Sequence, residues 1–195
     1  KTYNTQWSEI NVGCEACHGP ASEHVSWANS KKSNKEYKSQ NSGFGFSFKS
    51  ATSDQQISVC AACHSRRTSL SATFPPGQPV MDNFLPSHLR QELYYPDGQI
   101  LDEVYVYGSF LQSRMYQAGV QCSDCHNVHT AKLKLQGNKL CTQCHSKMLP
   151  EWEAGVYGKG AGNWRGDRED VTCVVCHEPH SLPFVPIEAK PKPKR

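Results

Sequence analysis

The chain has 195 residues, a formal net charge of +3 and an apolar content of 37%, with a mean hydropathy of −0.64. Its length would suffice for one ordinary domain, but its apolar content is low for a core of that size. It contains no apolar run long enough for a transmembrane helix and no signal-peptide pattern, so we take Lys1 as the start of a processed or trimmed chain. The small positive charge requires no nucleic-acid partner.

All ten cysteines fall in five copies of the pattern Cys-x-x-Cys-His, here called motifs 1 to 5 (residues 14–18, 60–64, 122–126, 141–145 and 173–177). This spacing is the attachment signature of c-type haem, in which two thiols form thioethers and the histidine binds the iron. The predicted thioether residues are Cys14, Cys17, Cys60, Cys63, Cys122, Cys125, Cys141, Cys144, Cys173 and Cys176. The predicted proximal iron ligands are His18, His64, His126, His145 and His177. Zinc sites are disfavoured, because zinc does not require a histidine after every second cysteine.

Five haem c groups would alter both the fold and the charge of so short a chain. Each macrocycle is a large apolar plate, so the haems themselves would form much of the core, and we expect the haem-free chain to be largely unfolded. Two propionates and one ferric centre per haem would change the net charge from +3 to roughly −2. Arg66, Arg67 and Arg114 could neutralise propionates or could be ordinary surface charges.

The first half of the chain is predicted to be mostly loop. Residues 30–58 are polar and rich in Gly, Ser and Lys, which predicts an exposed loop, although their three phenylalanines could fold back onto a haem. Residues 73–100 carry five prolines and two glycines. Within them, residues 86–94 could form a short helix.

The second half contains the best helix candidate, residues 102–118, whose apolar side chains recur every three to four positions and which Gly119 would end. Motifs 3 and 4 are the closest pair, so their haems are expected to be adjacent. Residues 155–166 are glycine-rich and predict a loop, and residues 183–195 predict an extended basic tail. The predicted fold is therefore mainly α with extensive irregular loops, a haem-dominated core and little or no sheet. The predicted domains are a pentahaem cytochrome c domain over residues 1–182 and the tail.

Four histidines lie outside the motifs, and three of them follow a motif histidine by only three to six residues. The four candidate distal ligands are His24, His88, His129 and His180. A residue three positions after a proximal histidine sits on the same side of its own haem. His129 and His180 are therefore expected to bind the iron of a neighbouring haem, which would hold the haems close enough for fast electron transfer.

Five haems need five distal ligands, and only four histidines are free. Exchange of histidines between identical subunits cannot change this count. At least one iron must therefore have another ligand, such as methionine, lysine, a chain terminus, water or a residue of a different protein, or an open position. Met115, just before motif 3, is the best protein candidate, and a thioether ligand would raise the potential of that haem. Packing in the core is the alternative role for this methionine.

Three stretches resemble a known family beyond the haem motifs: residues 7–27 (Trp-Ser-Glu-Ile-Asn-Val-Gly-Cys through to Trp27), residues 60–67 and residues 97–115. They are similar to multihaem cytochromes of the hydroxylamine-oxidoreductase-like superfamily, especially the haem region of members that carry tetratricopeptide repeats. The similarity runs from about residue 3 to residue 179. It implies that His24, His129 and His180 are haem ligands and that Met115 lies near a distal haem face. Family members usually have further motifs upstream and helical repeats downstream, so this chain resembles a trimmed or reduced member.

Three functions remain open from the sequence. The first is electron transfer by a periplasmic or cell-surface protein between redox partner proteins, with a homo-oligomer or filament as a special form. The second is an enzyme that uses an open haem to act on a small nitrogen or sulfur species. Against it, no motif has lysine in place of histidine. The third is an electron-entry subunit of a larger membrane redox complex. The haem count favours electron transfer.

Overall fold

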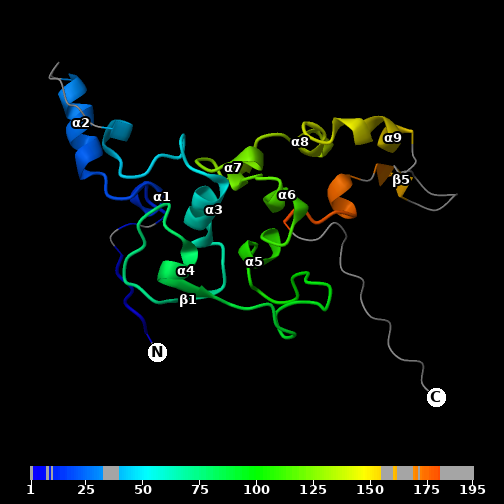
Figure 1. Cartoon of the computed structure of the whole chain (residues 1–195), viewed down its shortest axis with the longest axis horizontal. Helices are drawn as coiled ribbons and strands as arrows, with labels where there is room; N and C mark the ends of the chain where they lie inside the picture. Colours follow the sequence, from blue (N-terminus) through cyan, green and yellow to red (C-terminus); the bar gives the residue numbers. More distant parts are fainter. Residues whose placement is uncertain are drawn as a thin grey trace. The chain divides into compact units, whose positions relative to one another are not determined.

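The computed structural model describes residues 2–7, 9, 11–32, 40–154, 160–161, 169–170 and 172–180. These residues form short helices joined by long irregular segments, with three two-stranded sheets (Figure 1). The prediction of a mainly α chain with extensive loops and little sheet is confirmed. The helices are α1 (Glu15–His18), α2 (Ser22–Lys32), α3 (Ser53–Ala61), α4 (Val80–Asn83), α5 (Tyr107–Phe110), α6 (Arg114–Gln117), α7 (Cys122–Cys125), α8 (Asn138–Thr142) and α9 (Leu149–Glu153), with 3-10 turns η1 (Gln40–Gly43), η2 (Ser146–Met148) and η3 (Cys173–Val175).

The strands pair only with their neighbours in sequence. They are β1 (Arg67–Ser69) with β2 (Phe84–Pro86), β3 (His126–Asn127) with β4 (Lys132–Leu133), and β5 (Gly160–Ala161) with β6 (Glu169–Asp170). The second of these sheets is antiparallel, with His126 opposite Leu133. None of the helices in the described part of the chain has the length and apolar character needed to span a bilayer.

The chain divides into two compact units. The first comprises residues 1–63 and 67–85, and the second comprises residues 64–66 and 86–195. Motif 2 therefore has both its cysteines in the first unit and its histidine in the second. Each unit is described by itself below.

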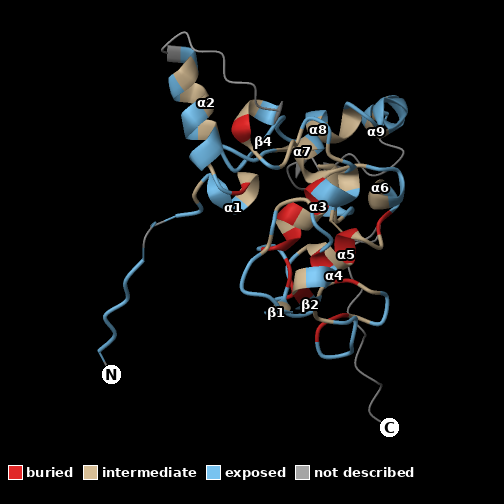
Figure 2. Cartoon of the chain, turned by 60° about the vertical axis from the view of Figure 1, so that its left-hand side comes forward, coloured by how far each residue is buried: buried red, intermediate tan, exposed pale blue. Residues whose placement is uncertain are grey.

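The small core of the first unit is built on α3. This helix begins with a capping box, in which the Thr52 hydroxyl accepts from the Gln55 backbone N–H at 3.2 Å and the Gln55 side chain accepts from the Thr52 N–H at 3.0 Å. The helix and the segment that follows it bury apolar side chains, shown in red on α3 and α4 in Figure 2. The buried apolar residues of this unit are Ile57, Val59, Ala61, Ala62, Val80 and Phe84.

A second contact in the first unit joins η1 to α2. Gly43 has a φ of 89°, and a Cβ there would lie 2.6 Å from backbone atoms of Glu23 and His24. Only glycine adopts this conformation without strain and leaves room for so close an approach. The glycine therefore lets the 40–43 turn lie directly against the helix that carries His24.

The core of the second unit is a cluster of Leu93, Tyr94 and Val104, against which Ile100 packs. Backbone hydrogen bonds bind residues 64–66 into this unit: Tyr107 N–H donates to the His64 carbonyl at 3.1 Å, and Arg66 N–H donates to the Val104 carbonyl at 3.1 Å. The residues at and after the motif 2 histidine are thus fixed by the 104–107 segment.

Two helix predictions in the second unit are wrong in extent. Residues 86–94 form no helix: Pro86 ends β2, and Tyr94 forms an isolated bridge with Ile100 that buries its ring. Within 102–118 only α5 and α6 are helical, because Tyr105 takes a φ of 60° and Ser113 leaves the helical conformation to cap α6 through its hydroxyl. Gly119, with a φ of 79°, ends α6 as predicted.

The predicted loop over residues 30–58 is also wrong at both ends, because α2 extends to Lys32 and α3 begins at Ser53. Two of its three phenylalanines, Phe44 and Phe48, contact the histidine of motif 1. The expected loop at 155–166 lies largely outside the described residues, and the expected tail at 183–195 lies wholly outside them.

Candidate haem sites and their ligands

Four of the five motifs share a local conformation that suits covalent haem attachment. In motifs 1, 3, 4 and 5 the histidine backbone N–H donates to the carbonyl of the first cysteine, at 3.0 Å in motif 1 and 2.9 Å in motif 4. This is one turn of helix, and positions i, i+3 and i+4 of a helical turn share a face. Both thiols and the imidazole therefore project to the same side, where one haem could meet all three.

The exposure of the motif side chains fits haem as well. None of the ten cysteines, all of which lie in the described ranges, forms a disulfide, and all are exposed or half-buried. Large apolar side chains beside the motifs are uncovered: Val12 is 72% exposed and Val128 is 59% exposed. Within motif 5, Val174 and Val175 are 54% and 59% exposed. Apolar surface gathered at these places requires a cover, and a haem plate over each motif would supply one.

In the first unit, aromatic side chains surround the motif 1 histidine. The rings of Phe44 and Phe48 each lie 5.1 Å from the ring of His18, measured between ring centroids. Phe44 and Phe46 also line a pocket of about 460 Å³. The imidazole of His18 therefore has two aromatic neighbours from the 44–48 segment.

His24, the candidate distal ligand of this unit, is half-buried on α2. Its ring stacks on Phe44 at 4.1 Å and on Trp27 at 5.4 Å. Its Nδ1 lies 2.8 Å from the Ser42 carbonyl oxygen. Because a carbonyl can only accept, Nδ1 carries the proton and Nε2 keeps the lone pair that a metal needs.

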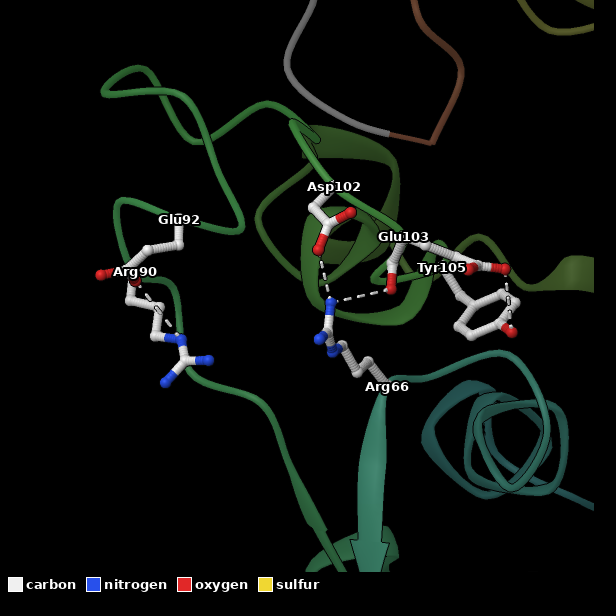
Figure 3. Close-up of polar contacts among 6 residues, drawn as sticks. All are labelled: Arg66, Arg90, Glu92, Asp102, Glu103 and Tyr105. Carbon is white, nitrogen blue, oxygen red and sulfur yellow. Dashed lines mark hydrogen bonds and ion pairs between the residues drawn. The ribbon is translucent and has the colours of Figure 1, made fainter.

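Motif 2 is followed by a polar cluster in the second unit (Figure 3). The Arg66 guanidinium donates to the Asp102 carboxylate at 2.7 Å and lies 3.5 Å from the Glu103 carbonyl, while the Tyr105 hydroxyl donates to the Glu103 carboxylate at 3.4 Å. The backbone N–H of Glu103, and then the Arg66 guanidinium, lower the pKa of Asp102. Arg66, a candidate propionate partner, is thus engaged with a carboxylate of the protein.

Motifs 4 and 5 are in direct contact. The Cys173 backbone N–H donates to the Asn138 side-chain oxygen at 2.8 Å, and Asn138 begins the helix that carries Cys141. Burial raises the pKa of the Cys141 thiol, and Cys173, to which that thiol is hydrogen-bonded, raises it further. Motifs 3 and 4 are also neighbours, because Cys144 is among the groups that raise the pKa of Cys125, after burial and Asp124. In the first unit, burial raises the pKa of the Cys17 thiol, and the nearby Cys63 raises it further.

Motifs 3 and 5 meet through two histidines. The rings of His126 and His180 lie 6.1 Å apart with an interplanar angle of 22°, as the orange 172–180 segment returns toward the green part of the chain (Figure 1). Burial lowers the pKa of His126, and His180 and His64 lower it further. His180 is held by Glu178, whose Oε1 accepts from the His180 backbone N–H at 3.0 Å and lies 3.1 Å from Nδ1.

The remaining candidate ligands are His88, His129 and Met115. His88 is exposed in the segment after β2, and His129 is exposed in the turn between β3 and β4, where its backbone N–H donates to the Asn127 side chain at 3.2 Å. Met115 is half-buried on α6.

Sequence reasoning did not identify three residues that organise these sites: Glu178, Asn138 and Phe44. Glu178 could have been found, since an acid two residues before a candidate ligand can reach its ring. Asn138 could not, because its partner Cys173 is 35 residues away in the chain. Phe44 was noted only as one of three phenylalanines that could approach a haem.

Comparison with known proteins gives one match. A family model described as a doubled CXXCH motif matches residues 115–149, which contain motifs 3 and 4 together with Met115 and His129. This match supports a multihaem c-type cytochrome. It covers less than a fifth of the chain, so covalently bound haem c is indicated most directly for these two motifs of the cytochrome. The search of curated proteins and the search of solved structures gave no significant match.

Proposed function

We propose that the protein carries electrons through five covalently bound haem c groups, between a redox donor and an acceptor, in the periplasm or at the cell surface. The contacts of motif 5 with both motif 4 and motif 3 carry this proposal, through Cys173 with Asn138 and His180 with His126. Haems attached at such positions would lie side by side, and electrons pass between redox groups only over short gaps. The resemblance to the hydroxylamine-oxidoreductase-like superfamily does not decide between electron transfer and catalysis, because that family contains both electron carriers and enzymes.

The residues of the chain have separate tasks in this proposal. When bound, haem supplies the one-electron chemistry. The ten motif cysteines would fix its position, the five motif histidines would each bind an iron, and His24, His88, His129 and His180 would supply second ligands, with Met115 as a candidate for the fifth. The half-buried ring of Phe44 lies against His18 and His24 and would shield these imidazoles in part from water. Residues 1–182 would act as the haem domain and residues 183–195 as its tail.

A multihaem oxidoreductase is the second candidate, and the shortage of histidines favours it. Only four histidines are available for five distal positions. Two of the four histidines, His88 and His129, are exposed. One iron could therefore keep an open position for a small nitrogen or sulfur species. Redox partner proteins, a filament of identical chains or a larger membrane complex would each be compatible with the electron-transfer role.

Low-temperature electron paramagnetic resonance of the oxidised protein separates the two functions. The spectrum is recorded alone, with nitrite and with hydroxylamine. Electron transfer predicts five low-spin haems whose signals do not change with either compound. A high-spin signal that shifts on addition of either compound would overturn the proposal in favour of the enzyme. A Met115→Leu variant then tests the fifth ligand: if Met115 binds iron, one low-spin signal is lost, and if it only packs, the spectrum is unchanged.

A further inference from the structure

We propose that Glu178 is a positioning residue that holds His180 as the second axial ligand of the haem attached at motif 3. The inference rests on the proposed haem function and deepens it, because it assigns one distal histidine to one iron and names the residue that tunes it. Neither the pattern of motifs nor the family match makes this assignment.

The separation of the two imidazoles is the first step. The centroids of His126 and His180 lie 6.1 Å apart, and their planes are inclined by only 22°. Two imidazoles bound to one metal through bonds of about 2 Å each have ring centres roughly 6 Å apart. The two side chains are thus spaced as the axial pair of one iron would be. The two rings lie farther apart than those of His24 and Phe44, whose centroids are 4.1 Å apart.

The second step is the fixed tautomer of His180. One oxygen of Glu178 accepts from the His180 backbone N–H at 3.0 Å and lies 3.1 Å from its Nδ1. An ionised carboxylate can only accept, so Nδ1 carries the proton and Nε2 is free to bind iron. Pro179 between them restricts the backbone, because its ring fixes φ, and so limits the positions that the carboxylate and the imidazole can take.

The anchoring of the 172–180 segment is the third step. At its beginning, the Cys173 N–H bonds to Asn138 at 2.8 Å, which ties the segment to motif 4. At its end, His180 faces motif 3. A segment fixed at both ends would hold the imidazole in place before the iron is bound, which reduces the ordering cost of ligation.

The negative charge of Glu178 predicts a measurable electronic effect. A carboxylate that accepts from the outer N–H of a metal-bound histidine makes the imidazole a stronger donor. A stronger donor stabilises ferric over ferrous iron, so this haem should have a lower midpoint potential than it would with a neutral partner. Replacing Glu178 by glutamine removes the charge with little change in shape.

The experiment uses the full-length holoprotein and three variants: Glu178→Gln, Glu92→Gln and His180→Gly. Glu92→Gln is the matched control, since it removes one negative charge from the same unit, where Glu92 pairs with Arg90 at 3.5 Å (Figure 3). Potentiometric titration and electron paramagnetic resonance are recorded for each. We expect Glu178→Gln to raise the potential of one haem and shift one low-spin signal, and Glu92→Gln to do neither. His180→Gly should make one haem high-spin, and added imidazole should restore it.

Two results would overturn the assignment. In one, Glu178→Gln and Glu92→Gln behave alike, or the Glu178→Gln shift persists in a His180→Gly background, so that Glu178 does not act through His180. In the other, the structure of the oxidised holoprotein has His180 bound to an iron other than that of motif 3, or to none. Neither result touches the proposed function, which fails separately if the wild-type protein has an open haem that responds to nitrite or hydroxylamine.

Discussion

His24 in the first unit and His180 in the second are both candidate distal ligands, but their surroundings differ. His24 is stacked between Phe44 and Trp27, and its Nδ1 donates to a neutral carbonyl, that of Ser42, at 2.8 Å. His180 faces another imidazole, and its Nδ1 contacts a carboxylate at 3.1 Å. Both contacts leave Nε2 for iron, so the two side chains are equally able to bind but differ in the charge of the group that holds Nδ1.

The comparison indicates how one chain could set different potentials with the same ligand type. A carbonyl orients an imidazole without adding charge, whereas a carboxylate orients it and strengthens it as a donor. The haem served by His180 should then be harder to reduce than the haem served by His24. A difference of this kind would give the electron path a direction.

Without haem, we expect both units to be largely unfolded. The described cores are small, and valines beside motifs 1, 3 and 5 are exposed by half or more. Too little apolar surface is buried to offset the entropy of ordering the chain. Chain produced without haem attachment should show little helix by far-ultraviolet circular dichroism and no cooperative thermal transition. A cooperative transition like that of the holoprotein would contradict this expectation.

Replacing Gly43 by alanine should disturb the His24 site through the backbone. The new Cβ would meet Glu23 and His24 backbone atoms at 2.6 Å, at a φ of 89°, and we expect a loss of about 3 kcal/mol in the free energy of unfolding. Gly45→Ala is the control, because a Cβ there has no neighbour within 4 Å. Chemical denaturation of both variants measures the difference, and equal stabilities would exclude the close contact.

Two substitutions of His24 separate ligation from packing. His24→Phe keeps a ring between Phe44 and Trp27 but cannot bind iron, whereas His24→Ala loses both functions. Each should cost one haem its second histidine. We expect the alanine variant to be less stable than the phenylalanine variant by about 2 kcal/mol, because the ring is only half-buried. Electron paramagnetic resonance shows whether an iron has lost its histidine ligand, and chemical denaturation measures the change in stability that results from lost packing. If both spectra match the wild type, His24 is not a ligand.

The smallest effect is expected at Arg66, outside both histidine sites. Arg66→Gln removes the contact with Asp102, whose pKa is lowered in the folded protein. A lowered carboxyl pKa contributes stability above the pKa of the unfolded state, about 3.9, and that contribution is lost as the pH falls through the folded value. The variant should melt slightly below wild type at pH 7, and the difference should vanish in acid once the pH lies below the pKa of Asp102 in the folded protein. A constant difference at all pH values would indicate a contribution of packing rather than charge.

The local conformation of most motifs follows from the sequence more directly than the elements between them. The Cys-x-x-Cys-His pattern determines its own helical turn, so the direction of thiols and imidazole follows from local geometry. The capping box at Thr52 and Gln55 was also readable, although the sequence analysis assigned that segment to a loop. By contrast, residues 86–94 have helical spacing but become irregular, because Leu93 and Tyr94 are buried with Val104, ten residues further on. Contacts of that kind are not visible in a local pattern.

The candidate ligands could likewise be proposed from the sequence, but the haem that each of them would bind could not. The sequence identified His180 as a candidate ligand. Because it follows His177 by only three residues, it was expected to bind a neighbouring haem. Which neighbour depends on the return of the 172–180 segment to His126 and on its bond to Asn138, and both are long-range contacts. The role of Glu178 follows only once the direction of the imidazole is known.

The central claim is that all five motifs carry haem, including the three outside the stretch that matches the doubled motif. The intact mass of the purified protein under denaturing conditions tests this most directly, because thioether-linked haem remains on the chain. The account predicts the polypeptide mass plus five haems, with Cys122→Ala/Cys125→Ala losing one. A mass that corresponds to two haems would confine attachment to motifs 3 and 4 and would contradict it.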